Sequence, residues 1–528
     1  MMARLLFLLT APWMLLGIQV SKAQSPFFRI CGEEEGSVLF QSLVPTADKG
    51  MILCGTHTDT SGKKMALLVK TDSIGSLTWA RHYGSNKDVQ GFSVKASPAG
   101  GYLMLADALG LGSDSSKNDF LLVKTDLQGQ PQWAKILGGS ESEQPGFLDM
   151  LPDGSWLLGG SSRTATDTLA AYAAKLSANG DLLWQAAYAA GTNQHFSCAL
   201  PLFGGDLALG GSALINNSSD FFLVRVNAPG DTLLSRLYGL PTRDEQMFSM
   251  VPGANAQITL AGMRRISPQS SEATLLRINA NADTVQTSSV ARIVSSKGMQ
   301  AEGLFDGSIL LSASIDADTT QAGMAERALL CKVSAGSSNI SKLLLPFDGN
   351  CEIKQTKALP NGGFVCSGFL PDSLQAARKN GLFIRSNAQN MIGCTEQDYT
   401  VSVLPSYTGT VKKGCTVFQP GYQLQDVSLF TQTLLLQTLV LCGKQDPQSS
   451  IEPGQEEDLR LYPNPAGEHI ILSGTKEKNC IMYNAIGMQI QSMESSTGAD
   501  QKIDISKLSP GVYFIRIGEE TKSFIKQP

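Results

Sequence analysis

A unit of about 50 residues recurs seven times in this chain, and no other feature limits its fold as strongly. A basic residue marks each copy, and successive marks lie 50 to 55 residues apart: Lys70, Lys124, Lys175, Arg225, Arg277, Lys332 and Arg385. A glycine turn followed by a short apolar run keeps the same phase, as in 50–55, 154–159, 205–210, 307–312 and 363–368. Two anchors that hold one period along the chain indicate a repeat architecture.

Each unit is predicted to contain four short strands. In the second copy these are 92–97, 101–106, 120–125 and 132–137, with turns rich in glycine, proline and aspartate between them. The third strand is almost continuously apolar, which indicates burial on both faces. Four strands per unit are typical of a propeller blade, so we expect an all-β fold with about seven blades over residues 24–394. A β-solenoid is the structural alternative, although its repeats are usually shorter.

The phase of the repeat also predicts how the ring closes. Residues 28–32 (FRICG) resemble 134–138 (AKILG), which form a fourth strand. We therefore expect the start of the mature chain to complete the last blade, which removes open sheet edges. The residue nine places after the basic mark is Trp79, Trp133 or Trp184 in the first three copies and changes afterwards. These tryptophans are interpreted as residues that pack blades together, not as a cofactor site.

The strand count predicts which loops share a face. Loops between the second and third strands and between the fourth strand and the next blade emerge on one side, and they are long and variable: 107–118, 140–144, 264–272, 316–326 and 371–380. The opposite side has tight glycine turns. Binding sites tend to lie on variable loops held by a rigid scaffold, so the long-loop face is the candidate binding surface.

The N-terminus is predicted to be a signal peptide, residues 1–23. Arg4 precedes an apolar stretch over 5–18, and small residues at Ser21 and Ala23 place cleavage between Ala23 and Gln24. A membrane anchor is the alternative, but this stretch is shorter than the roughly 20 residues that span a bilayer. No transmembrane segment is expected in the mature chain. The net charge of -5 argues against a nucleic-acid partner, because such proteins present a basic surface.

Two segments separate the repeats from the C-terminus. Alternating apolar residues within 395–444 predict additional strands, and the sequence leaves open whether they form an extra blade or an appendage. Residues 445–458 are rich in proline, glycine, serine and acidic residues and are predicted to be a linker.

The last 70 residues, 459–528, carry a distinctive set of motifs: LYPNP at 461–465, IMYNAIG at 481–487, LSPGVYFIR at 508–516 and KSFIK at 522–526. In order and spacing they resemble the type A C-terminal sorting domain of type IX secretion system cargo. The resemblance implies a small immunoglobulin-like β-sandwich, recognition by the type IX machinery, and export through the periplasm to the cell surface or beyond. The motif residues it points to are Tyr462, Pro463, Asn464, Pro465, Gly487, Gly511, Tyr513 and Lys526.

No pattern in the sequence predicts a catalytic, metal or cofactor site. The four histidines share no metal-ligand spacing and are interpreted as isolated surface or turn residues. The ten cysteines contain no CxxC pair, so a zinc site is not expected. Several buried free thiols are expected, together with one or two disulfide bridges, most plausibly among the cysteines of the stretch from Cys351 to Cys442. No cofactor is predicted. We expect a non-catalytic binding or structural protein with a glycan or protein ligand. A secreted carbohydrate-active or other hydrolytic enzyme is the alternative.

Overall fold

The computed structural model divides the chain into two compact units, Met1–Asp446 and Pro447–Pro528. In the first unit it describes residues 26–32, 36–112, 114–164, 166–240, 243–267, 270–293, 299–304, 306–316, 326–333, 340–344, 351–371, 378–387, 392, 403–404, 410–413, 416–418, 423–434 and 436–443. In the second it describes 460–462, 466, 468–473, 479–484, 489–494, 501–508, 511–517 and 520–526. The predicted cleavage site at Ala23 and Gln24 lies outside these residues.

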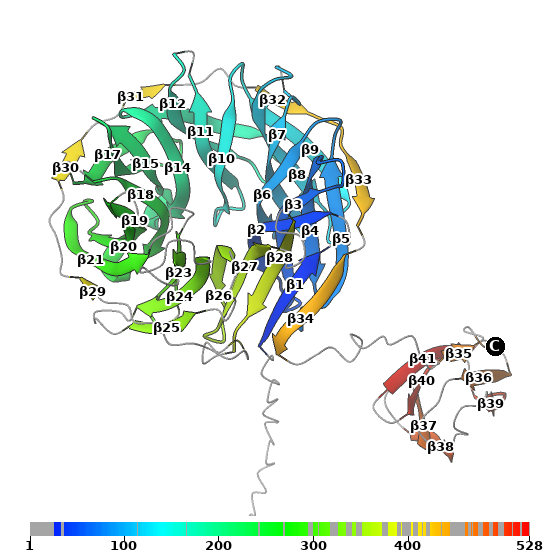
Figure 1. The fold of residues 1–528 in the computed structure, drawn as a ribbon. Coiled ribbons are helices and arrows are strands. Elements are labelled where there is room, and N and C mark those ends of the chain that lie inside the picture. Colours follow the sequence, from blue (N-terminus) through cyan, green and yellow to red (C-terminus); the bar gives the residue numbers. More distant parts are fainter. Residues whose placement is uncertain are drawn as a thin grey trace, which may run out of the picture. The chain divides into compact units, whose positions relative to one another are not determined.

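The first unit is a β-propeller of seven blades, which confirms the repeat-based prediction (Figure 1). Blades 1 to 3 consist of β2 (Ser37–Pro45), β3 (Met51–Thr58), β4 (Lys64–Thr71) and β5 (Leu77–Gly84); β6 (Val89–Ala96), β7 (Tyr102–Leu109), β8 (Asn118–Thr125) and β9 (Pro131–Gly138); and β10 (Glu143–Met150), β11 (Trp156–Arg163), β12 (Leu169–Leu176) and β13 (Leu182–Ala189). Blades 4 to 6 consist of β14 (Thr192–Pro201), β15 (Leu207–Ile215), β16 (Ser218–Val226) and β17 (Thr232–Gly239); β18 (Glu245–Pro252), β19 (Ile258–Ser267), β20 (Ser270–Ile278) and β21 (Thr284–Ile293); and β22 (Met299–Gly303), β23 (Ile309–Asp316), β24 (Glu326–Val333) and β25 (Ile340–Leu344). The first strand of each blade lies innermost. Two short 3₁₀ turns, Phe203–Gly205 and Ala254–Ala256, are the helical elements among the described residues.

The seventh blade joins the two ends of the repeat region. Its strands β26 (Glu352–Ala358), β27 (Phe364–Pro371) and β28 (Lys379–Arg385) are followed in space by β1 (Phe27–Gly32), which pairs antiparallel with β28. Phe28 pairs with Ile384, just as Ala134 pairs with Val123 in the second blade. The start of the chain therefore closes the ring as an outer strand, as the sequence predicted.

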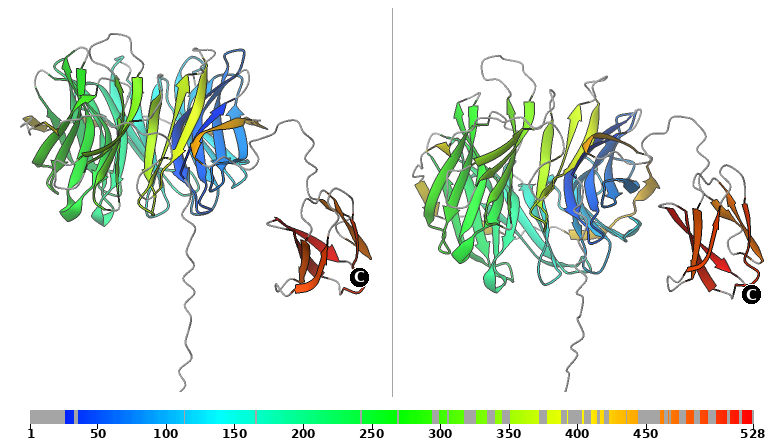
Figure 2. Two further views of the ribbon diagram at one scale, coloured as in Figure 1. Left: turned by 60° about the horizontal axis from the view of Figure 1, so that its bottom comes forward. Right: turned by 90° about the horizontal axis from the view of Figure 1, so that it is seen from below.

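The hydrophobic core is divided among the interfaces between blades. Leu67 and Val69 of β4 pack in a cluster shared with the seventh blade, whereas Ala66 and Leu68 pack in a cluster shared with the second. Successive residues of a strand point to opposite sides of the sheet, so a strand covered on both sides must be apolar at every position. This packing explains the continuous apolar runs of the third strands. In side view the blades stand next to one another with their turns at the two faces of the ring (Figure 2).

A segment that we call the belt, residues 403–443, runs around the outside of the ring. It contains β29 (Val403–Leu404), β30 (Thr410–Lys413), β31 (Thr416–Phe418), β32 (Gln423–Asp426), β33 (Phe430–Thr433) and β34 (Gln437–Gly443). These strands pair antiparallel with the outer strands β21, β17, β13, β9, β5 and β1, in that order. The belt thus passes the blades in reverse order and adds a fifth strand to six of them (Figure 1). It is neither an extra blade nor a separate appendage.

Belt side chains also enter the grooves between blades. Leu434 and Leu436 pack against the cluster between blades 7 and 1, and Val427 and Leu429 pack against the cluster between blades 1 and 2. The backbone repeats the same contact from blade to blade: the amide of Leu434 donates to the carbonyl of Ala80 (2.9 Å), and that of Val427 donates to Ala134 (3.0 Å). From blade 2 to blade 1 the contact therefore moves by seven residues along the belt.

The second unit contains two small antiparallel sheets. One consists of β35 (Arg460–Tyr462), β36 (His469–Ser473) and β39 (Gln501–Asp504), and the other of β38 (Gln489–Glu494), β37 (Asn479–Asn484), β40 (Gly511–Ile517) and β41 (Glu520–Lys526). Both contribute to one apolar core, in which Ile470 and Leu472 of the first sheet meet Met482 and Ile515 of the second. An immunoglobulin-like topology for this unit stays a prediction. Among all described residues, no helix is long and apolar enough to cross a membrane.

Candidate functional site

The strand order gives the ring two different faces. Loops after the second and fourth strands of each blade form the long-loop face, and turns after the first and third strands form the turn face. A cavity of about 620 Å³, which we call the long-loop cavity, lies at the long-loop ends of strands from blades 1, 2, 3 and 7. Its lining is mostly polar: Ser37, Leu39, Gln41, Thr56, Thr58, Lys64, Gln90, Gly91, Phe92, Asp107, Asn118, Gln144, Pro145 and Lys379. Three of the five predicted long loops (107–118, 140–144 and 371–380) contribute to it.

Asp107 and Asn118 stand at the two ends of one of these loops. The Asn118 amide donates to Asp107 Oδ2 at 3.0 Å, while Asp107 Oδ1 is buried and accepts no hydrogen bond from the described residues. Burial raises the pKa of Asp107 to about 6, although the Asn118 amide and the charge of Lys64 oppose this shift. The long-loop cavity thus contains one carboxyl group that exchanges its proton near neutral pH.

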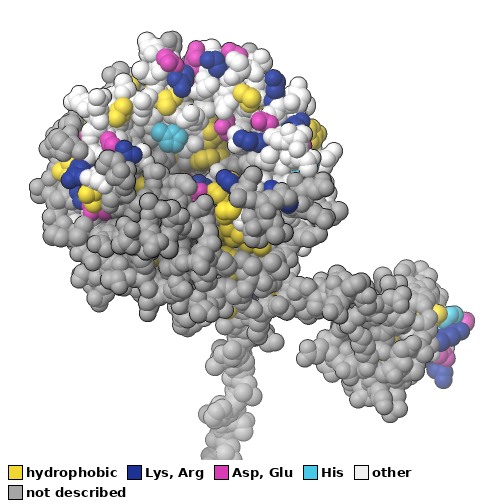
Figure 3. All heavy atoms as spheres, viewed as in Figure 1, with side chains coloured by type: hydrophobic (Ala, Val, Ile, Leu, Met, Phe, Trp, Pro, Cys, Tyr) yellow, Lys and Arg dark blue, Asp and Glu magenta, His cyan; other side chains and the backbone are white. Residues whose placement is uncertain are grey.

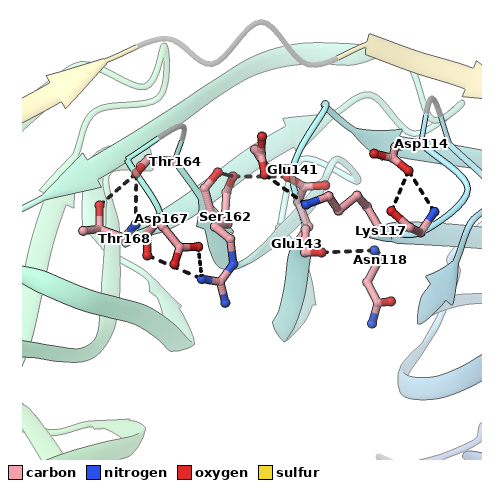
Figure 4. A network of polar contacts seen from close by, with 12 residues as sticks. Asp114, Lys117, Asn118, Glu141, Glu143, Ser162, Thr164, Asp167 and Thr168 are labelled. Carbon is pink, nitrogen blue, oxygen red and sulfur yellow. Dashed lines mark hydrogen bonds and ion pairs between the residues drawn. The ribbon is translucent and has the colours of Figure 1, made fainter.

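Polar contacts tie the loops beside the cavity to one another (Figure 4). Lys117 forms an ion pair with Glu141 of the next loop at 3.3 Å, and Ser162 donates to the buried Glu143 at 3.1 Å. On the neighbouring loop Arg163 pairs with Asp167 at 2.7 Å. The Lys117–Glu141 pair joins loop 107–118 to loop 140–144, and both loops contribute residues to the cavity lining.

A repeated β-bulge shapes the centre of the ring. In the innermost strands of six blades one residue has no partner on the second strand, and the register shifts there. The extra residues are Gln41, Phe92, Gly146, Ser197, Phe248 and Lys354. All six line a central channel cavity of about 660 Å³. A bulge bends the strand and redirects a side chain, so the same irregularity in each blade lines the channel.

Ion pairs compensate charges within the channel cavity. Lys95 lies 2.5 Å from Asp149, and Lys357 lies 2.8 Å from Glu302. Gln41 and Phe92 line both this cavity and the long-loop cavity, so the two meet at these residues. The face viewed in Figure 3 likewise mixes basic and acidic side chains over its described part. The ring therefore offers a ligand polar groups of both signs.

The basic residues that mark the repeat have a structural role at the turn face. Lys70, Lys175 and Lys332 pair with Asp48, Asp153 and Asp306 at 2.6, 2.9 and 2.6 Å. Each of these aspartates follows the first strand of its blade and also accepts hydrogen bonds within its own turn. The strongest repeat signal therefore identifies residues that anchor the turns of their own blades.

The repeated tryptophans pack neighbouring blades together, as expected. Trp79 covers Gly129 of the next blade, where a β-carbon would lie 2.8 Å from the indole, and its Nε1 donates to the carbonyl of Leu127 at 3.2 Å. Trp133 and Trp184 cover Gly180 and Gly230 in the same way. These glycines have positive φ angles, so both the turn and the indole above it require glycine.

The interpretation of the histidines as surface or turn residues is wrong for two of them. His57 and His82 are buried, and their rings stack with centroids 5.7 Å apart. His82 Nε2 lies 3.2 Å from Gln432 Oε1 of the belt. His195 lies near Ser161, and burial lowers its pKa to about 4. Within the described residues no group of three or more histidine, cysteine, aspartate or glutamate side chains could hold a metal ion.

The described cysteines are free thiols, and most of them are buried. Cys351 and Cys366 belong to the stretch in which disulfides were expected. Both are unbridged in the core between blades 6 and 7, so the expectation is wrong for these two. Burial raises the pKa of each to about 12. The side chains of Cys394, Cys415 and Cys442 lie outside the described residues.

The structure places half of the predicted sorting-motif residues. Tyr462 ends β35; Gly511 begins β40 and pairs with Lys526 at the end of β41. Lys526 also forms a parallel bridge with Ala466, immediately after the LYPNP motif. Tyr513 lies in the core of the unit, and so does Cys480. Pro463, Asn464, Pro465 and Gly487 lie outside the described residues.

Sequence reasoning missed the residues of the bulges, and it predicted strands within 395–444 without the belt arrangement that they form. The bulge positions hold glutamine, phenylalanine, glycine, serine and lysine, so no residue type marks them. Position is the signal that was available: in blades 1, 3, 4 and 7 the bulge residue lies eight or nine residues before the glycine that begins the apolar run (Gly50, Gly154, Gly205 and Gly363).

Comparisons with known proteins address the second unit most directly. Residues 460–527 match the protein family described as secretion system C-terminal sorting domain. No curated protein matches the chain.

Several solved structures resemble the chain weakly, among them the following two. One is a protein of unknown function from Dyadobacter fermentans DSM 18053, with 10% identity over 69% of this chain and 98% of the other, at a TM-score of 0.40. The second is a fungal alcohol oxidase of the AA5 family in complex with copper, with 10% identity over 93% of this chain and 97% of the other, at a TM-score of 0.39. The strand topology and the matched C-terminal family together show that the chain is a seven-bladed β-propeller followed by a type IX secretion system sorting domain, and that it is exported to the cell surface or beyond.

Proposed function

We propose that this exported protein binds a glycan in the long-loop cavity without catalysing a reaction. The lining of that cavity is the observation that supports this proposal. It places hydroxyl, amide, carboxyl and ammonium groups around a space of about 620 Å³. A sugar hydroxyl both donates and accepts hydrogen bonds, and side chains such as Thr58, Gln90 and Asn118 offer matching partners. Phe92 adds the apolar surface against which a sugar ring packs.

Binding to an array of bacterial and host oligosaccharides tests this function. We expect the mature chain to retain a limited set of glycans and Gln90→Ala to weaken that binding at least tenfold. The matched control is Ile74→Ser, because Ile74 is exposed on the turn face. Equal loss in both variants, or no glycan bound by the parent protein, would contradict the proposal.

A hydrolytic enzyme is the second candidate, and the pKa of Asp107 favours it. A carboxyl group with a pKa of about 6 is suited to protonate a glycosidic oxygen near neutral pH. The two functions differ in their response to Asp107→Asn. An enzyme would lose release of reducing ends from a bound polysaccharide, while a binding protein shows no such release in either form.

We also propose how the chain reaches its destination. Residues 1–23 are removed after Ala23 on entry to the periplasm, so that the mature protein begins at Gln24. Residues 459–528 then engage the type IX machinery through the motif around Tyr462 to Pro465. The sequence motifs support this order, and the mass of the secreted protein tests it at both ends.

A further inference from the structure

A third cavity, which we call the turn-face pocket, opens between blades 4 and 5. It measures about 410 Å³ and lies on the face opposite the long-loop cavity. Aliphatic side chains dominate its lining, among them Leu202, Ile258 and Ile278, and Phe203 stands at its edge. This size and composition are typical of sites for small ligands.

The repeat explains why a pocket exists at this interface. Ile258 begins the second strand of blade 5 and pairs with Ile278, as Trp156 begins the second strand of blade 3 and pairs with Leu176. Trp156 is fully buried, and its Nε1 donates to the carbonyl of Ala178 at 3.4 Å. At blade 3 the indole of Trp156 therefore fills a space, and at blade 5 the smaller Ile258 leaves the equivalent space open.

A second indole is also missing. Leu234 pairs with Arg225 at the position where Trp133 pairs with Lys124 in blade 2. Trp133 covers the third turn of the next blade, while the shorter Leu234 faces the equivalent turn at Ala282. The turn-face pocket thus lies where two aromatic rings pack in an equivalent interface of the same protein.

The edge of the pocket carries groups that favour a flat ring. Phe203 is fully exposed on a short 3₁₀ turn, whereas the equivalent turns of blades 2 and 3 have Pro98 and Pro152. Arg225 lines the wall; its guanidinium is paired with Asp206 at 3.1 Å and donates to the carbonyl of Ala280 at 2.8 Å. Exposed aromatic side chains stack on flat ligands, and a held guanidinium attracts the face of a ring.

We propose that the turn-face pocket is a binding site for a small planar aromatic molecule of about the size of an indole. The site is independent of the long-loop cavity, because it uses blades 4 and 5 at the other face of the ring. The ring of the ligand takes the place that Trp156 occupies at the interface of blades 2 and 3, with Phe203 against it.

Titration of the mature full-length chain with indole tests this site. Binding is measured by calorimetry and by saturation-transfer NMR. We expect one site per chain with a micromolar to millimolar dissociation constant. Ile258→Trp should weaken binding at least tenfold, since it copies the filling of blade 3. The matched control Ile74→Trp adds an indole at an exposed position of the turn face and should leave the affinity unchanged.

Two further variants keep the proposal testable if Ile258→Trp does not fold. Phe203→Ala changes a fully exposed side chain and should weaken indole binding at least threefold. Trp156→Ile should open the equivalent space at blade 3 and raise the stoichiometry from one site to two. Absence of indole binding to the parent chain, or an unchanged affinity in folded Ile258→Trp or in Phe203→Ala, would overturn the proposal.

Discussion

Phe27 lies directly opposite Arg385 in the seventh blade, in the register that places Trp79 opposite Lys70 in the first. The ring of Phe27 covers Gly75 of blade 1, as Trp79 covers Gly129 of blade 2. Residues from the two ends of the repeat region thus rebuild the contact that joins consecutive blades. The closing interface is a copy of the others, so it should carry a comparable share of the stability.

Phe27→Ala should lower the free energy of unfolding by about 3–5 kcal/mol, because Phe27 is buried and its loss leaves a cavity beside Gly75. Chemical denaturation of the mature chain measures this change. Leu183→Ala, at an exposed position of β13, is the control and should change the free energy by less than about 0.5 kcal/mol. A similar small effect for Phe27→Ala would mean that β1 does not hold the ring closed.

The repeat made the blades and their closure predictable from sequence. Each blade buries local strand pairs, and its pattern of glycine turns and apolar runs appears in consecutive residues. Even the closure could be inferred, because residues 28–32 resemble an outer strand. In the seventh blade the residue opposite the basic mark comes from the other end of the region: Phe27 of β1 lies opposite Arg385.

The belt and the candidate site were beyond such reasoning for physical reasons. The belt strands are two to seven residues long and pair only with strands far away in the chain, so no local pattern marks their partners. The stacking of His57 on His82 depends on neighbouring strands in the same way. The sequence predicted long loops at the face where the long-loop cavity lies, but the residues that line this cavity come from four separate blades.

The belt should stabilise the propeller even though it follows the last blade. A chain that ends after residue 387 leaves a free edge on six outer strands, and it also loses the half-buried side chains of Leu424, Val427, Leu429, Leu434 and Leu436. At roughly 1 kcal/mol for each of these side chains, the loss is several kcal/mol. Exposed strand edges also favour aggregation. We expect this chain to melt at lower temperature and to aggregate, while a chain that ends after residue 443 behaves as the parent does. Equal melting temperatures would show that the belt is only a tether.

Glu245 should make the stability depend on pH near neutrality. Burial raises its pKa from 4.5 to about 8, and the nearby Asp220 carboxyl adds to this shift. Between these values the unfolded state is ionised while the folded state keeps its proton, so stability falls as the pH rises from 4.5 to 8. Glu245→Gln should therefore leave the free energy of unfolding unchanged at pH 4 and raise it by an amount on the order of a few kcal/mol at pH 8.

Thermal unfolding of both proteins across this range measures the difference. Glu141→Gln is the control, since the Glu141 carboxylate is paired with Lys117 at the surface. A Glu245→Gln variant with a constant offset at all pH values would show that Glu245 ionises in the folded state as it does in the unfolded one.

Residues 459–528 should be dispensable for folding of the propeller but necessary for export. The two compact units divide between Asp446 and Pro447, and the belt ends at Gly443, so this deletion removes no strand of the ring. The sorting domain buries its own core around Ile470, Met482 and Ile515. In the native host we expect the shortened protein to accumulate in the periplasm, resistant to protease and with the melting temperature of the parent propeller. The reciprocal experiment fuses residues 447–528 to an unrelated periplasmic protein, which should then reach the cell surface or the medium. Normal surface amounts of the shortened protein, or retention of the fusion in a host with an active type IX system, would show that the signal for export lies elsewhere in the chain.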